Sequence, residues 1–181
     1  LLCALALLQL VSPAEAVSGF SNPAVITVWA MFIMSEGLTR AGIADSIGRR
    51  VIRLSGNSET QMIIVIMLVA GLLSAFMSNI GVVALLLPVT VDAARRCGIA
   101  PAKVLMPMAF GAMLGGLLTL IGTPPNLLVS MALENSNQAG FDLFDFALIG
   151  LPVLLAGTLF MAFIGRHILP ATDLGRAGPA G

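Results

Sequence analysis

The sequence predicts an all-α integral membrane protein with transmembrane helices, a re-entrant helical hairpin and one broken helix. Hydrophobic residues make up 58% of the 181-residue chain and charged residues 10%, and the mean hydropathy of +1.02 lies far above that of a soluble domain. Residues 60–91 carry no charge and hold the polar pair Ser78-Asn79 near their middle. A second uncharged run, residues 104–133, is interrupted by Gly122-Thr123-Pro124-Pro125-Asn126.

The hairpin follows from the charges that bracket the first run. Basic residues stand on both sides of it: Arg49, Arg50 and Arg53 before, and Arg95, Arg96 and Lys103 after. Loops rich in Lys and Arg normally stay cytoplasmic, so the run should enter and leave the membrane by one face. About 32 residues give ~48 Å of helix, short of the ~60 Å that two crossings need. We therefore expect a re-entrant hairpin over residues 60–94, with its tip at residues 78–81 inside the membrane.

The first 57 residues predict scaffold-side transmembrane helices. Residues 1–16 are either the end of a truncated transmembrane helix or a signal peptide, because Ala14-Glu15-Ala16 resembles a cleavage site. The uncharged residues 16–35 are long enough for one span, with Asn22-Pro23 near its start. The chain has no initiator Met and begins in a Leu-rich run, so we expect a fragment.

An amphipathic helix is expected after that span, at the cytoplasmic interface. Ile43, Ile47, Val51 and Leu54 form one helical stripe, and the neighbouring arginines lie off it. A plain solvated loop is the alternative.

Residues 58–170 are expected to form half of a transport domain. Two adjacent prolines forbid a continuous helix through residues 104–133, so one half should end before Gly122 and the other begin after Pro125. The loop 134–145 holds only acidic charges and suits the outside, whereas loops 40–59 and 95–103 suit the cytoplasm. Residues 146–165 form a final span, and residues 171–181 a linker or truncation edge.

Two interrupted apolar segments in one chain are typical of ion-coupled transporters, and nothing in the chain indicates an enzyme. Ends of broken helices expose carbonyls that ligate sodium and N–H groups that attract anions. Hydroxyl and amide oxygens complete such sites without a buried carboxylate. Suitable residues are Ser74, Ser78, Asn79, Thr119, Thr123 and Asn126. Close helix packing is the alternative reading of the small residues, and the favoured one for Gly111, Gly115 and Gly116.

These motifs also carry a resemblance to a known family. LSAFMSNIGVVALLLP followed by GGLLTLIGTPPNLLVS resembles the divalent-anion:sodium symporters, the sulfate and dicarboxylate permeases with their citrate-transporter-like relatives, within the ion transporter superfamily. SPAEAVSGFSNPAVITV resembles the lead-in to the span before the hairpin in that family. The likeness covers roughly residues 11–165 and only the first of two inverted repeats.

The resemblance implies an elevator-like transporter that works as a homodimer in a membrane, here the bacterial inner membrane. It implies a sodium site at Ser74, Ser78, Asn79 and Gly122. It also implies a substrate site for sulfate or di- and tricarboxylates, formed by Ser78, Asn79, Thr123 and Asn126. Ile80 departs from the family pattern, in which many members have Thr, and this puts direct anion contact at that position in doubt.

Two alternatives remain open at this point. An arsenite or proton-coupled antiporter of the same superfamily would use different chemistry in the same fold. A non-transporting membrane subunit that serves a partner would need no ion site at all.

Overall fold

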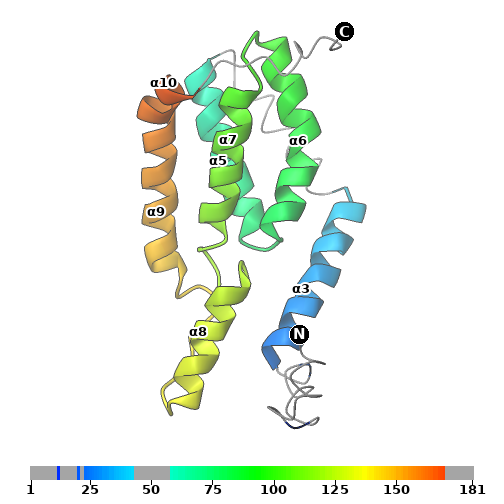
Figure 1. The fold of residues 1–181 in the computed structure, drawn as a ribbon, viewed down its shortest axis with the longest axis vertical. Coiled ribbons are helices and arrows are strands. Elements are labelled where there is room, and N and C mark those ends of the chain that lie inside the picture. The colour runs from blue at the N-terminus through cyan, green and yellow to red at the C-terminus, as the bar shows by residue number, and fades with distance from the viewer. Residues whose placement is uncertain (1–11, 13–19, 21–22, 43–57, 170–181) are drawn as a thin grey trace.

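A computed structural model describes residues 12, 20, 23–42 and 58–169 of the chain, and over these residues it contains helices and turns but no strands. The all-helical class is therefore confirmed for this part of the molecule (Figure 1). In chain order the helices are α3 Pro23–Arg40, α5 Glu59–Ser74, α6 Asn79–Arg96, α7 Ala102–Gly115, α8 Pro124–Asn135, α9 Ala147–Phe160, the π-helix η2 Met161–Gly165 and α10 Arg166–Ile168.

Three predicted segments lie outside the described residues. They are the N-terminal apolar segment (apart from Ser12), the amphipathic helix with its Ile43, Ile47, Val51 and Leu54 stripe, and the linker 171–181.

Helix α3 covers the part of the first predicted span from residue 23 onward and extends beyond the predicted end at residue 35. It begins at Pro23, where a missing N–H costs a helix little, and it continues past Glu36 to Arg40. Arg40 Nε donates to Glu36 Oε1 at 2.8 Å, an i,i+4 ion pair that supports the last turn. In Figure 1 the C-terminal end of α3 lies beside the lower part of α6, slightly above the turn between α5 and α6.

One described stretch, Ala147–Ile168, is long and apolar enough to cross a membrane, with 22 residues and a mean hydropathy of 2.3. It comprises α9, η2 and α10, and it agrees with the span predicted at residues 146–165. Helices α5 and α7 are apolar but shorter, with 16 and 14 residues.

Helices α5 and α6 run side by side in opposite directions, joined by a turn at residues 75–78 (Figure 1). The sequence places the hairpin tip at residues 78–81, whereas the turn lies three residues earlier. The reason is the N-cap of α6: Ser78 Oγ accepts from the backbone N–H of Gly81 at 3.1 Å, so Asn79, Ile80 and Gly81 form the first helical turn.

Between α7 and α8 the chain leaves helical geometry over residues 116–123. The sequence places this interruption at residues 122–126, several residues too late. Pro124 and Pro125 occupy the first two positions of α8, where proline is tolerated, so they begin a helix instead of breaking one. The preceding helix already ends at Gly115.

Glycines allow α5 and α7 to pack backbone to backbone, and they allow α9 to approach the backbone that follows α7. A Cβ on Gly115 would collide with the backbone of Gly71, and one on Gly111 would lie 2.6 Å from Met67 O. On the next helix, a Cβ on Gly150 would collide with the backbone of Leu117. The packing role expected for Gly111 and Gly115 is therefore confirmed, since small residues are what such close approach requires. Buried side chains of α5, α6 and α7 surround this contact, among them Met62, Ile66, Val82, Leu86, Val104 and Met108.

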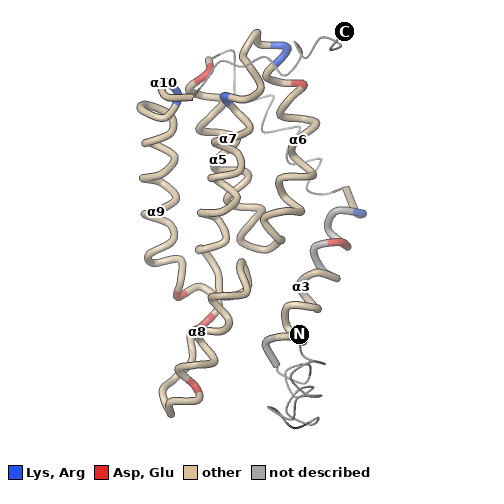
Figure 2. The backbone as a smooth tube through the Cα atoms, in the orientation of Figure 1, with Lys and Arg blue, Asp and Glu red and all other residues tan. Residues whose placement is uncertain are grey.

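Charged residues of the described chain, apart from those on α3, lie in two regions (Figure 2). The end that holds the C-terminus of α6, the N-termini of α5 and α7, and α10 carries both signs of charge. The segment from the last turn of α8 to the residue before α9 carries only acidic charges: Glu134, Asp142 and Asp145. We call the end that holds Arg95, Arg96, Lys103 and Arg166 the basic end.

Substitution of Gly115 by Ala should separate α5 from α7. Because the new methyl group would meet the backbone of Gly71, the helices must move apart, which typically costs about 1–3 kcal/mol. Thermal unfolding of the longest natural chain that contains these residues, in detergent, measures the loss. Gly37→Ala is the matched control, because a Cβ there meets nothing within 4 Å. Equal stability of the two variants would contradict the packing described above.

Candidate functional site

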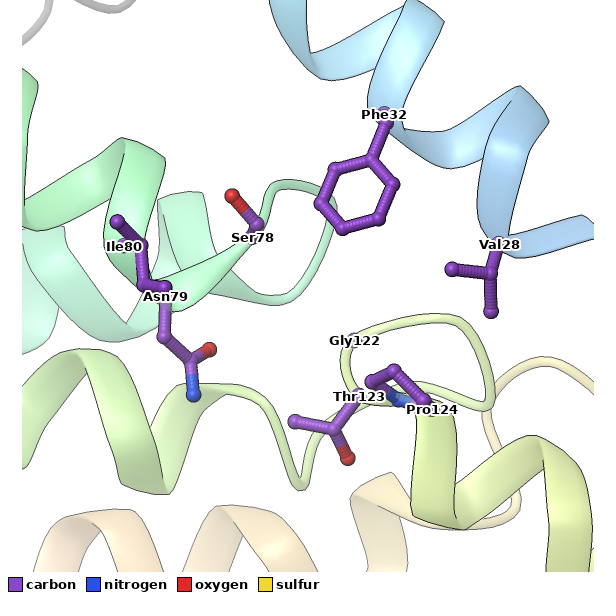
Figure 3. A pocket seen from close by; sticks show the side chains of 8 residues that line it. All are labelled: Val28, Phe32, Ser78, Asn79, Ile80, Gly122, Thr123 and Pro124. Carbon is purple, nitrogen blue, oxygen red and sulfur yellow. The ribbon is translucent and has the colours of Figure 1, made fainter. Parts of the chain in front are cut away.

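A pocket of about 260 Å³ lies where the start of α6, the start of α8 and the side of α3 meet (Figure 3). The α5–α6 hairpin and the interruption between α7 and α8, which are far apart in the sequence, thus line the same cavity. The lining residues are Val28 and Phe32 of α3, Ser78, Asn79 and Ile80 at the start of α6, and Gly122, Thr123 and Pro124 at the start of α8.

Two helix N-termini point their positive dipole ends toward this pocket. Ser78 is the N-cap of α6 and Thr123 is the N-cap of α8, both with extended backbone dihedral angles. The first N–H groups of a helix have no intrahelical acceptor and favour a negative charge nearby. Pro124 and Pro125 lack an N–H, so most of the direct donors must come from α6.

The pocket contains no ionisable side chain among its lining residues. Its polar groups are the side chains of Ser78, Asn79 and Thr123, and its opposite wall consists of Val28 and Phe32. An anion in this pocket would therefore be held by helix dipoles, N–H groups, hydroxyls and an amide, beside an apolar wall. Such a site binds without the salt bridge that a buried Arg or Lys would supply.

Ser74 and Asn79 are joined across the turn of the hairpin. Ser74 is buried at the end of α5, and its Oγ donates to Asn79 Oδ1 at 2.5 Å. Both Asn79 and Thr123 lie against Gly116. A Cβ added to Gly116 would be 3.1 Å from Asn79 Oδ1 and 2.6 Å from Thr123 Cγ2. The absence of a side chain at Gly116 is what allows Asn79 and Thr123 to approach each other. Hydroxyl and amide oxygens of this kind suit a hard alkali cation, so the donor set fits sodium.

Asn126 donates hydrogen bonds to backbone carbonyls of the interruption between α7 and α8. Its Nδ2 donates to Gly116 O at 3.0 Å and to Thr119 O at 2.8 Å, and the side chain is buried. Thr119 is buried too, and its Oγ1 donates to Ala75 O in the hairpin turn at 2.5 Å. Asn126 thus gives Gly116 O a donor and gives Thr119 O a second donor beside the Gly122 N–H, which lies at 3.2 Å. The Thr119 bond connects the interruption to the hairpin turn.

The predicted site residues therefore fall into two groups. Ser78, Asn79, Gly122 and Thr123 line one pocket, whereas Ser74 lies behind Asn79 and Asn126 lies behind the interruption. Sequence reasoning missed the wall from Val28 and Phe32, which depends on a tertiary contact that no local pattern reveals. It also read Gly116 as helix packing, although that glycine lies against Asn79 and Thr123.

Comparison with known proteins gives the family. A model of the citrate transporter family matches residues 1–175. The uncharacterized transporter YfbS of Escherichia coli is 42% identical over 147 residues, which are 81% of this chain and 24% of that protein. The uncharacterized transporter sll0640 of Synechocystis sp. is 37% identical, over 92% of this chain and 27% of its own length.

A probable sodium/sulfate cotransporter 3 of Chlamydomonas reinhardtii is 31% identical, over 91% of this chain and 19% of its own length. The chain thus spans about a quarter or less of these relatives. Because the family model covers almost every residue, the chain belongs to the citrate transporter family, which confirms its resemblance to the divalent-anion:sodium symporters.

Proposed function

We propose that the chain is part of a secondary active transporter that carries a small anion, sulfate or a di- or tricarboxylate, together with sodium. The convergence of two helix N-termini on one pocket with no ionisable lining residue carries this proposal. It is supported by relatives whose names are sodium/sulfate cotransporter, at 31–32% identity.

In this proposal the anion lies against the start of α6. Ser78 and Asn79 donate to it from one side and the Thr123 hydroxyl from the other, while the dipoles of α6 and α8 offset part of its lost hydration. Asn126 contributes indirectly, since both hydrogen bonds of its Nδ2 go to backbone carbonyls of the interruption. We assign it to positioning Gly122 and Thr123.

Sodium is proposed to bind between Ser74, Ser78, Asn79 and the backbone near Gly122. Ser74 Oγ and Asn79 Oδ1 already lie together, so a cation there would fix the orientation of the Asn79 amide. With Oδ1 turned to the cation, the Nδ2 group faces away from it and can donate to the anion. Binding of sodium thereby prepares the anion site, which gives a physical basis for coupled transport.

The hairpin is proposed to be re-entrant, at residues 60–94, and α7 with α8 to be one broken transmembrane helix, at residues 104–133. The 16 residues of α5 give ~24 Å of helix, less than the ~30 Å hydrocarbon core, so α5 stops short of a full crossing. The Lys and Arg residues of loops 40–59 and 95–103 favour a cytoplasmic location for both loops, in the bacterial inner membrane, with the acidic loop 134–145 outside.

The complete transporter is proposed to contain a second, inverted repeat and to function as a homodimer. The share of each relative that this chain covers, 19–27%, leaves ample length for such a repeat.

Asn79→Ala should abolish sodium-dependent uptake. The experiment uses proteoliposomes with the longest natural chain, labelled sulfate, succinate or citrate, and an inward sodium gradient. Asn135→Ala, at the exposed end of α8, is the matched control and should transport like the wild type. Uptake that is independent of the sodium gradient and driven by a pH gradient would contradict sodium coupling. Unchanged uptake by Asn79→Ala would contradict the proposed binding site.

Ile80→Thr should strengthen anion binding. Ile80 is 84% exposed in the first turn of α6 and lines the pocket, so a hydroxyl there gains a bond to the anion without disturbing the core. One such bond is worth about 1 kcal/mol, or roughly fivefold in the concentration for half-maximal uptake. Ile80→Val has nearly the shape of the Thr variant without its hydroxyl and should leave the value unchanged. Equal effects of Thr and Val would show that size, not hydrogen bonding, matters at this position.

Asn126→Asp should lower both stability and transport. The carboxylate cannot donate to Gly116 O and Thr119 O. Thr119 O keeps its bond from the Gly122 N–H, but Gly116 O loses its side-chain donor, and an unpaired buried carbonyl costs about 1–3 kcal/mol. Thermal unfolding and uptake are compared with Asn135→Asp, which is exposed. If Asn126→Asp unfolds like the wild type yet fails to transport, Asn126 contacts the substrate directly and its positioning role is wrong.

A further inference from the structure

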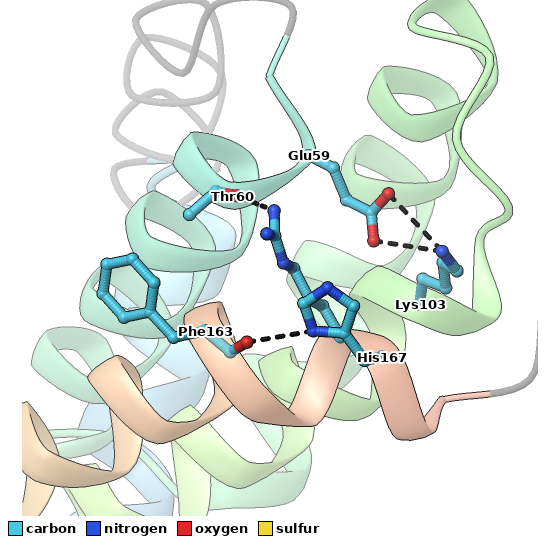
Figure 4. A network of polar contacts seen from close by, with 6 residues as sticks. Glu59, Thr60, Lys103, Phe163 and His167 are labelled. Atoms are coloured by element: carbon cyan, nitrogen blue, oxygen red, sulfur yellow. Dashed lines mark hydrogen bonds and ion pairs between the residues drawn. The ribbon is translucent and has the colours of Figure 1, made fainter.

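Arg166 occupies an unusual position at the basic end, where α10 begins beside the N-terminus of α5. Its Nη1 donates to Thr60 Oγ1 at 2.5 Å, drawn as a dashed line in Figure 4, and its Nε is buried without an acceptor. A guanidinium has five N–H donors, so a single bond leaves most of its capacity unused.

The charge of Arg166 is also unpaired within the described part of the chain. Two other arginines of this part have carboxylate partners: Arg40 bonds to Glu36, and Arg96 bonds to Asp92. Glu59, the residue before Thr60, accepts from Lys103 Nζ at 3.2 Å (Figure 4). Arg95 has no ion pair among these residues either, but it is exposed to solvent, whereas Arg166 is half-buried. A half-buried cation with no counter-charge indicates that a ligand supplies one.

The surroundings of Arg166 favour a lipid as that ligand. It lies at the end of Ala147–Ile168, the described stretch that is long and apolar enough to span a membrane. Neighbouring apolar side chains are exposed: Phe163 by 58%, Ile164 by 52% and Ile168 by 73%. The π-helix η2 immediately before Arg166 adds a residue to the turn and thereby changes the direction in which the next side chains point. Arg166 thus contacts α5 while the apolar side chains remain uncovered.

We propose that Arg166 binds the phosphate of an anionic phospholipid whose acyl chains lie along Phe163, Ile164 and Ile168. The planar guanidinium matches a phosphate group, and basic sites between transmembrane helices are suited to lipid headgroups. The exposed His167, whose Nδ1 lies 3.0 Å from Phe163 O, borders the same headgroup region. This site is at the opposite end of α5 from the pocket and does not depend on the transported ion.

Lipid binding to the longest natural chain tests the proposal directly. Native mass spectrometry counts phosphatidylglycerol and phosphatidylcholine bound to the purified protein as each lipid is titrated in. We expect a preference for phosphatidylglycerol that Arg166→Gln weakens about tenfold, equivalent to ~1.4 kcal/mol. Arg95→Gln removes an equal charge from an exposed position near the same end and should bind like the wild type.

Three results would contradict the proposal that Arg166 binds an anionic phospholipid. The first is equal binding of the two lipids by the wild type, as expected if a carboxylate elsewhere in the full chain pairs with Arg166. The second is unchanged phosphatidylglycerol binding by Arg166→Gln. The third is complete displacement of the lipid by millimolar inorganic phosphate, which would identify a site for free anions. If gel filtration shows that Arg166→Gln does not fold, Arg166→Lys takes its place and must weaken binding about threefold, because it loses the planar fork.

Discussion

The geometry of the site depends on the hydrogen bonds that the backbone carbonyls between α7 and α8 accept in place of water. A helix interrupted in apolar surroundings leaves carbonyls that must find donors. Asn126 supplies two such bonds from one amide, to Gly116 O and Thr119 O. Thr119 extends the network to Ala75 O in the hairpin turn, so hairpin and interruption are held together by hydrogen bonds as well as by packing. These bonds and the packing together fix the position of the two helix N-termini relative to each other.

Glycine contacts determine how closely the elements approach. Gly71 and Gly115 bring α5 and α7 into backbone contact, and Gly116 leaves the space in which Asn79 and Thr123 meet. The resulting pocket combines oriented helix ends with an apolar wall from Phe32 and Val28. Low-dielectric walls strengthen the field of the helix dipoles at the site, because less water screens them. The absence of lining charges is therefore compatible with binding of an anion that must later be released.

Much of this arrangement could be predicted from the sequence. The uncharged runs and their charged borders predicted the helical class, and Ser78, Asn79, Gly122 and Thr123 indeed line one pocket. Positions of turns were less accurate, because Ser78 serves as an N-cap and Pro124 begins a helix, roles that depend on geometry. The burial of Asn126 and the contribution of α3 arise only from tertiary contacts, which local patterns do not encode. Residues 43–57, with their predicted amphipathic helix, lie outside the described part.

The central claim, that an anion occupies this pocket when sodium is present, can be tested by chemical protection. Val28 lines the pocket without contributing a polar group, so Val28→Cys reports occupancy at little cost to binding. The background replaces Cys3, Cys97 and every other cysteine of the full natural chain by Ser. The rate of labelling by a water-soluble maleimide is measured in the full natural chain with sulfate, succinate or citrate, in sodium and in potassium. The account predicts that one of these anions slows labelling in sodium and not in potassium. A rate that none of the anions changes in either salt would contradict it.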